Sequence, residues 1–184
     1  MKRILTLSLF LIYVLSLSAQ RDVTQFLGIP VDGSKQAMIQ KLKAKGFKYD
    51  ASTDMLSGRF NGTDVHISIV TENGKVYRIA VVEDVENDEA GIKIRFNRLC
   101  NQFERNSKYI NPKDYSQMLS DEENISYEMT VNAKRYEADY YQRGESVDGL
   151  AQRIVWFVID KGYNSYRIIL FYDNGRNQAN GEDL

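Results

Sequence analysis

Apolar residues recur at helical spacing in two segments of the chain. In the first, Met38, Ile39 and Leu42 follow Ser34, whose hydroxyl suits an N-cap, and Gly46 is typical of a left-handed helix terminator. In the second, four large side chains recur at i, i+4, i+7 and i+11: Ile92, Phe96, Leu99 and Phe103. Both patterns predict amphipathic helices with one buried stripe each, and Asp88 is placed to cap the second helix.

The other regular segments alternate or are continuously apolar, as β-strands are. They are FKYD (47–50), MLSGRF (55–60), HISIVTE (66–72), KVYRIAVVED (75–84), ISYEMTV (125–131), KRYEADYYQ (134–142), RIVWFVID (153–160) and YRIILFYD (166–173). The connection 107–124 is expected to contain a short helix near 113–119.

Asn73-Gly74 is a strong hairpin signal, because a type I′ turn needs positive φ at both central residues. Counting outward from a two-residue loop places Ser68 opposite Ile79. The face of this hairpin that is expected to be buried carries Val65, Ile67 and Ile69.

VYRIAVVED (76–84) and SYRIILFYD (165–173) share Tyr-Arg-Ile and a terminal Asp at a constant offset. An internal duplication explains the match, and coincidence between two strands is the alternative. We predict an α+β fold: residues 20–173 form one domain of two tandem helix-plus-antiparallel-strand repeats, about 20–87 and 88–173. The repeats would build a curved antiparallel sheet with helices on one face, followed by a disordered tail at 174–184.

The N-terminus has the three parts of a secretory signal peptide. Lys2 and Arg3 precede the apolar run ILTLSLFLIYVLSL, and small residues follow it. The run is shorter than the roughly 20 residues of a membrane-spanning helix, which favours cleavage after Ser18 or Ala19 over an uncleaved anchor. We therefore expect residues 1–19 to be a signal peptide and the mature protein to be periplasmic or secreted, without membrane insertion.

Charge and cysteine content exclude several classes of protein. Removal of residues 1–19 leaves 22 basic against 25 acidic residues, a net charge of −3, without the basic stripe typical of nucleic-acid binding. Cys100 is the single cysteine, so no intrachain disulfide can form. The mature domain must therefore rely on its own core.

The segment GIPVDGSKQAMIQKLKAKGF (28–47) resembles the entry to the small α/β modules of the BamE-like and β-lactamase-inhibitor-protein-like exported proteins. The resemblance covers about 20–87 directly and 88–173 as a degenerate second copy. It implies a curved antiparallel sheet with helices on one face and a partner on the other. The chain lacks the lipobox of the former and the disulfides of the latter, so it implies the architecture alone.

No catalytic, metal or cofactor set is expected. His66 shares a strand face with Ser68, but no nucleophile-elbow motif accompanies them, and Cys100 lies at the edge of the apolar stripe, as a buried inert thiol does. One His and one Cys cannot make a zinc site, and DVENDE (84–89) lacks the glycine and the final acidic ligand of a calcium loop. A hydrolase would need Ser68 or Cys100 to meet His66.

Aromatic residues concentrate in the second half, where IVWFVI and IILFY are apolar on both faces of a strand. Such strands need cover on both sides, yet the two clear helices suffice for one. The second side is then covered within the monomer, as in a two-sided core, or forms a homodimer seam, or binds a protein partner in the envelope. For a partner-binding surface we expect Trp156, Tyr166, Tyr172, Tyr140 and Tyr77. A carbohydrate or small-ligand site with the same rings as stacking platforms is the alternative.

Overall fold

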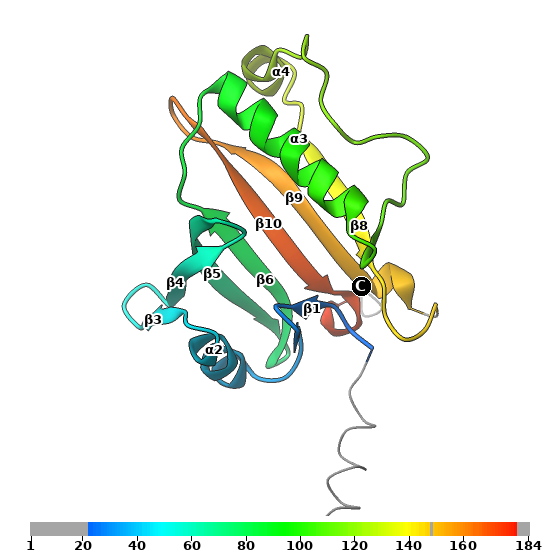
Figure 1. The fold of residues 1–184 in the computed structure, drawn as a ribbon. Helices are drawn as coiled ribbons and strands as arrows, with labels where there is room; N and C mark the ends of the chain where they lie inside the picture. Colours follow the sequence, from blue (N-terminus) through cyan, green and yellow to red (C-terminus); the bar gives the residue numbers. More distant parts are fainter. Residues whose placement is uncertain (1–21, 148, 180–184) are drawn as a thin grey trace, which may run out of the picture.

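The structure is a computed structural model that describes residues 22–147 and 149–179. It is an α+β fold built on an antiparallel sheet of eight strands in the order β3-β4-β5-β6-β10-β9-β8-β7, with a small β1–β2 ribbon beside it (Figure 1). The strands are β1 (Gln25–Phe26), β2 (Ile29–Pro30), β3 (Lys48–Asp50), β4 (Met55–Phe60), β5 (Thr63–Glu72), β6 (Lys75–Glu83), β7 (Tyr109–Ile110), β8 (Glu137–Gln142), β9 (Arg153–Lys161) and β10 (Tyr166–Asn174).

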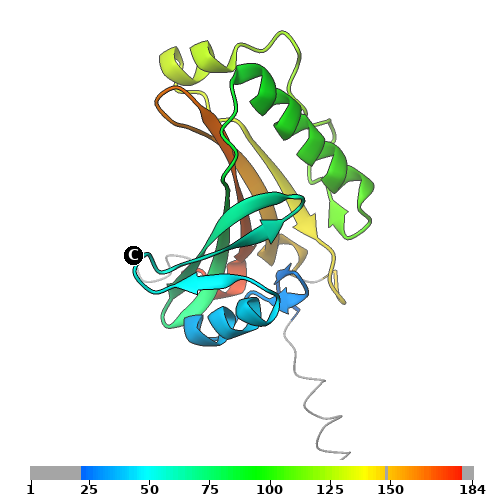
Figure 2. The ribbon, with the colours of Figure 1, turned by 60° about the vertical axis from the view of Figure 1, so that its left-hand side comes forward.

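The two halves of the chain build the sheet from its edges toward its centre. Each half supplies a helix followed by four strands of the large sheet, and the last strands of the halves, β6 and β10, pair in the middle through residues 78–82 and 169–173. The sheet is strongly twisted from one half to the other (Figure 2). The predicted fold class is confirmed, whereas descent of the halves from one ancestor stays a prediction.

The helices are α2 (Lys35–Ala44), α3 (Glu89–Arg105) and the short α4 (Ile125–Val131). The Ser34 hydroxyl caps α2 by accepting from the amide of Ala37, and the Asp88 carboxylate caps α3 by accepting from the amide of Gly91. Gly46 has a φ of +97°, as the predicted helix terminator requires. Both capped helices therefore begin where their sequences predicted.

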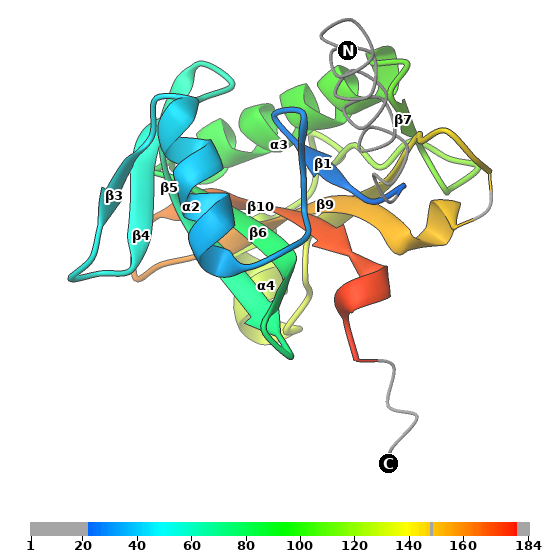
Figure 3. The same ribbon diagram turned by 90° about the horizontal axis from the view of Figure 1, so that it is seen from below.

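The core lies between the sheet and the helices on one of its faces. The predicted stripe of α3 is buried, and so are Met38, Ile39 and Leu42 of α2. Val65, Ile67 and Ile69 of β5 are at most 3% exposed, which confirms the predicted core face of the hairpin. Figure 3 shows the β1–β2 ribbon standing between α2 and the C-terminal end of α3.

Residues 125–131 form a helix rather than the predicted strand. The Asn124 side chain accepts from the amide of Tyr127, and Ile125 and Met129, four residues apart, pack against the core. The expected helix at 113–119 is also wrong. Instead, Gln117 from this segment donates to the backbone carbonyl of Asp139 and accepts from its amide, at 2.7 and 3.0 Å, and so caps the edge of β8 beyond β7.

The β5–β6 hairpin has the predicted turn but not the predicted register. Asn73 and Gly74 both have positive φ, and Glu72 pairs with Lys75. A bulge between Val70 and Thr71 then shifts the pairing by one residue, so Ser68 faces Ala80. Because of this shift, Val81 and Ile79 stand beside Ile67 and Ile69 on the buried face.

Part of the predicted tail is ordered. Asn174 donates from its side chain to the carbonyl of Val31, and Asn177, in the 3₁₀ turn Gly175–Asn177, donates to the carboxylate of Asp32 and the carbonyl of Val76. Residues 180–184 and the predicted signal peptide lie outside the described residues. Within the described ranges, no helix has the length and apolar content needed to cross a membrane.

Candidate functional site

The face of the sheet away from α2 and α3, called here the open face, is richest in apolar groups along β9 and β10. On β9, Val155, Phe157 and Ile159 are buried toward the helices, while Ile154, Trp156 and Val158 alternate with them and are half-buried. The same alternation on β10 places Ile169 and Phe171 on the open face. Both faces of these strands are apolar, as their sequences predicted, and the helices cover one of them.

Trp156 is the centre of an aromatic platform on the open face. It stands opposite Phe171 in the β9–β10 register, and the two rings stack with centroids 4.1 Å apart and an interplanar angle of 20°. The guanidinium carbon of Arg78 on β6 lies 4.9 Å from the Phe171 centroid and 5.4 Å from that of Trp156. This geometry is that of cation–π contacts. Three strands thus contribute to one rigid surface.

Asp173 holds this platform together. Its carboxylate accepts from Nε and Nη2 of Arg78, both at 2.7 Å, and from the indole nitrogen of Trp156 at 2.9 Å. The hydroxyl of Thr24 donates to its backbone carbonyl. Asp173 is 5% exposed, and its hydrogen bonds raise the pKa of the Arg78 guanidinium. The hydrogen bonds to Asp173 therefore fix the orientations of Trp156 and Arg78 in the free protein.

Ion pairs of both signs surround the aromatic platform. Arg135 pairs with Glu137 at 2.7 Å and also lies 5.2 Å from the Trp156 centroid. The other pairs are Lys113–Asp139 at 3.3 Å and Arg167–Asp160 at 3.6 Å. Each cation has an anion beside it, so the open face has no strong net charge around its rings.

The structure divides the five residues expected on a partner surface between the two faces. Trp156 belongs to the platform, and the half-buried Tyr77 joins it through Arg78, which lies 5.6 Å from the Tyr77 centroid. Three others are buried in the core on the helix-covered face: Tyr140 at 0%, Tyr166 at 7% and Tyr172 at 5% exposed. The five rings therefore do not share one surface or line one cleft.

Of the residues considered for a hydrolase, Ser68 shares a face of β5 with His66, whereas Cys100 lies on the other side of the sheet, in α3. His66 is exposed, and its Nε2 lies 3.1 Å from a carboxylate oxygen of Asp84. Cys100 is buried on α3 with Tyr140 beside it, and burial raises the pKa of its thiol to about 11. Over residues 22–147 and 149–179, no group of three His, Cys, Asp or Glu side chains could hold a metal ion.

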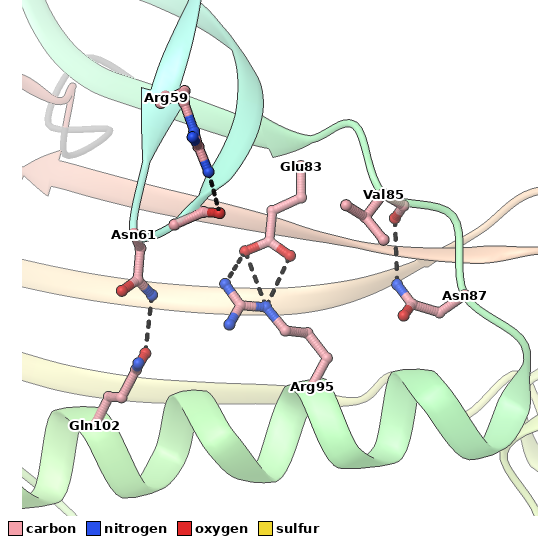
Figure 4. Close-up of polar contacts among 8 residues, drawn as sticks. Arg59, Asn61, Glu83, Val85, Asn87, Arg95 and Gln102 are labelled. Atoms are coloured by element: carbon pink, nitrogen blue, oxygen red, sulfur yellow. Dashed lines mark hydrogen bonds and ion pairs between the residues drawn. The ribbon is translucent and has the colours of Figure 1, made fainter.

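A cleft of about 1120 Å³ opens on the other face of the sheet, next to the C-terminal end of α3. Its apolar and aromatic lining includes Phe60 of β4, Leu99 and Phe103 of α3, and Leu170 and Tyr172 of β10, together with Val23, Leu27 and Tyr109. Two other lining residues, Asn61 in the β4–β5 turn and Gln102 of α3, are joined by a side-chain hydrogen bond of 2.8 Å (Figure 4). No motif or pattern in the sequence indicated this cleft.

The rim of the cleft is basic. Its charged lining residues are Arg59, Arg105, Lys108, Arg143 and Asp22. Asp22 is already engaged, because its carboxylate lies 2.6 Å from the buried guanidinium of Arg153. Arg59 bonds the carbonyl of Gly62 (Figure 4) and lies 3.8 Å from Asp64. Among the described residues, Arg105, Lys108 and Arg143 have no ion-pair partner.

Comparison of the chain with protein-family models, with curated proteins and with solved structures gave no match. The resemblance of residues 28–47 to the BamE-like and β-lactamase-inhibitor-protein-like modules stays a prediction.

Proposed function

We propose that the protein is an exported, non-enzymatic binding protein that docks a protein partner in the cell envelope on the open face of its sheet. One observation carries the proposal: Trp156, Phe171 and Arg78 form a half-exposed, stacked surface that the helices of the chain leave uncovered. Trp, Tyr and Arg dominate the binding energy of protein interfaces when they lie at their centre.

The platform is pre-organised for binding. Asp173 bonds both Arg78 and Trp156, and the Trp156 ring is stacked, so little rotamer freedom remains to be lost when a partner arrives. Immobilising a free side chain at an interface costs about 0.5–1.5 kcal/mol, so a surface that is already ordered binds more tightly for the same area. The side chain of Asp173 is 8% exposed, so it acts as an orienting group for the rings and not as a contact surface.

The charges on the open face indicate the chemistry of the partner. Because Arg78, Arg135 and Arg167 all have carboxylate partners, the surface offers apolar area within a balanced polar rim. This suits a folded protein that presents an apolar or aromatic patch, and it disfavours a polyanion such as nucleic acid. The affinity should accordingly depend little on salt.

Replacement of Trp156 by alanine tests the proposal. The control is Tyr163→Ala, which removes a 96% exposed ring from the β9–β10 loop. Proteins captured from an envelope extract are purified and titrated against the wild type and both variants, after circular dichroism and urea midpoints have shown that the variants fold. We expect a direct partner whose affinity falls about 30-fold or more with Trp156→Ala and is unchanged with Tyr163→Ala.

Trp156 is also the only tryptophan, so its fluorescence reports directly on the platform. A direct partner should change its emission. Retention of every direct partner by a folded Trp156→Ala protein would refute the proposal. Sedimentation showing a dimer that this substitution dissociates would assign the open face to a second copy of the chain, and would likewise refute a separate partner.

A further inference from the structure

We infer that the cleft beside the C-terminal end of α3 binds an amphiphilic carboxylate, a molecule with one anionic head and a long apolar chain. The site lies on the helix-covered face of the sheet and shares no residue with the aromatic platform. The inference is therefore independent of the proposed docking function.

The charge of the rim points to an anion. Four cationic side chains line the cleft against one carboxylate, in a chain whose formal net charge is −1. That carboxylate, on Asp22, is neutralised by Arg153. Arg105, Lys108 and Arg143 approach from the end of α3, the following loop and the end of β8, and no carboxylate among the described residues pairs with them. A ligand that brings a negative charge would complete this arrangement.

The rest of the lining points to an apolar chain and a single charge. Side chains of α3 and β10, among them Leu99, Phe103 and Leu170, form the floor. No glycine-rich phosphate loop accompanies the cations, and the end of α3 at the cleft is the C-terminal one, not the N-terminal end at which phosphates bind. The volume, about 1120 Å³, slightly exceeds the usual range for small-molecule sites, about 300–1000 Å³.

Leu27 gives a second, independent indication. It occupies the β1–β2 turn at the mouth of the cleft with a φ of +53°, a conformation that a leucine rarely adopts, and it is 39% exposed. Asn or Gly would fill this position without strain, as Gly28 does beside it. Strained residues cluster where a protein meets its ligands. The large apolar side chain of Leu27 is therefore well placed to contact the hydrocarbon tail of the ligand.

Calorimetric titration of the purified protein with dodecanoate, below its micellar concentration, tests the inference. We expect one saturable site, an affinity that rises about two- to fourfold for each methylene from decanoate to tetradecanoate, and no binding of acetate or dodecyltrimethylammonium. The joint change Arg105→Gln, Lys108→Gln and Arg143→Gln should weaken dodecanoate binding at least tenfold.

A matched control removes three cations elsewhere, with Lys41→Gln, Lys45→Gln and Lys75→Gln, and should leave the affinity unchanged. The Trp156→Ala protein should bind dodecanoate as the wild type does, which separates this site from the open face. The inference is overturned if dodecanoate does not bind, if the rim variant binds as tightly as the control, or if the cationic detergent binds equally well. Binding to phosphatidylglycerol vesicles without binding of dodecanoate would assign the rim to a membrane surface, and would also overturn it.

Discussion

Arg78 and Asp173 face each other across the central pair of strands, and the guanidinium donates two hydrogen bonds of 2.7 Å to the carboxylate. The pair joins the last strand of one half of the chain to the last strand of the other. The same carboxylate orients Trp156, so the seam between the halves and the proposed docking surface depend on one side chain.

Replacement of Asp173 by asparagine should weaken the seam between the two halves and the proposed docking surface. The amide keeps an acceptor for Trp156 but loses the charge that pairs with Arg78, so we expect a loss of about 1–3 kcal/mol in the free energy of unfolding. Urea titration followed by circular dichroism measures it, and a red shift of Trp156 emission in the folded state would report a loosened ring. The control is Asp160→Asn, whose pair with Arg167 is largely exposed, with an expected change of at most about 1 kcal/mol. Equal effects of the two substitutions would contradict the role given to Asp173.

Glu83 forms the second tie between the halves, on the buried face. It lies at the end of β6, 1% exposed, and accepts from Nε of Arg95 on α3 at 2.9 Å (Figure 4). Glu83→Gln leaves the guanidinium without its anion in a nearly dry site, so the free energy of unfolding should fall by about 3–5 kcal/mol. Glu137→Gln, which breaks the exposed pair with Arg135, should cost at most about 1 kcal/mol in the same urea titration. A small loss for both would show that the buried pair contributes little.

The Cys100 thiol should be inert in the folded protein. Burial raises its pKa from 9.0 to about 11, so almost no reactive thiolate exists at pH 8. Iodoacetamide at pH 8, read by mass spectrometry, should label the native chain far more slowly than the chain in urea. Rapid native labelling would mean that α3 opens readily from the sheet.

The raised pKa also predicts loss of stability in base. The folded protein holds the Cys100 proton up to about pH 11, whereas the unfolded chain releases it near pH 9, so this contribution is complete below pH 9 and is lost as the pH rises to 11. Burial likewise raises the pKa of Tyr140 and Tyr172, which act in the same direction at higher pH. Urea midpoints at pH 7.5, 9.5 and 10.5 should fall, and less steeply for Cys100→Ala. Identical slopes for the two proteins would refute the contribution of Cys100.

Leu27→Asn should separate stability from ligand binding. Asparagine tolerates the left-handed conformation of this turn, so the protein should gain about 0.5–1 kcal/mol in the free energy of unfolding while its affinity for dodecanoate falls. Leu27→Ala removes the same apolar contact but keeps the strain, and should bring no gain. If both variants bind dodecanoate as the wild type does, Leu27 has no part in the site.

Features set by nearby residues could be predicted from the sequence. The caps Ser34 and Asp88, the stripe of α3 and the Asn73-Gly74 turn all depend on contacts within a few positions, which the sequence displays. The bulge at Val70 could not be predicted in this way. It depends on which side chains of β6 are buried by α2 and α3, which are distant in the sequence. The segment 125–131 alternates over too short a span to separate a strand from a two-turn helix.

The candidate sites were harder to predict, because distant segments assemble them. Trp156 was expected at a surface, but a strand that is apolar on both faces does not reveal which of Phe171 and Tyr172 points toward the helices. The bond between Arg78 and Asp173 follows from the β6–β10 register, which the sequence does not display. The cleft draws on six elements, β1, β4, α3, β7, β8 and β10, which only the topology brings together.

The pairing of β6 with β10 also constrains the order in which the molecule can form. The chain is made from its N-terminus, so β6 is complete long before residues 169–173, its partners on the inner side, have been synthesised. Until then, the backbone amides and carbonyls of β6 on that side are unpaired and form a free strand edge. Free edges of this kind allow β-proteins to mispair and aggregate.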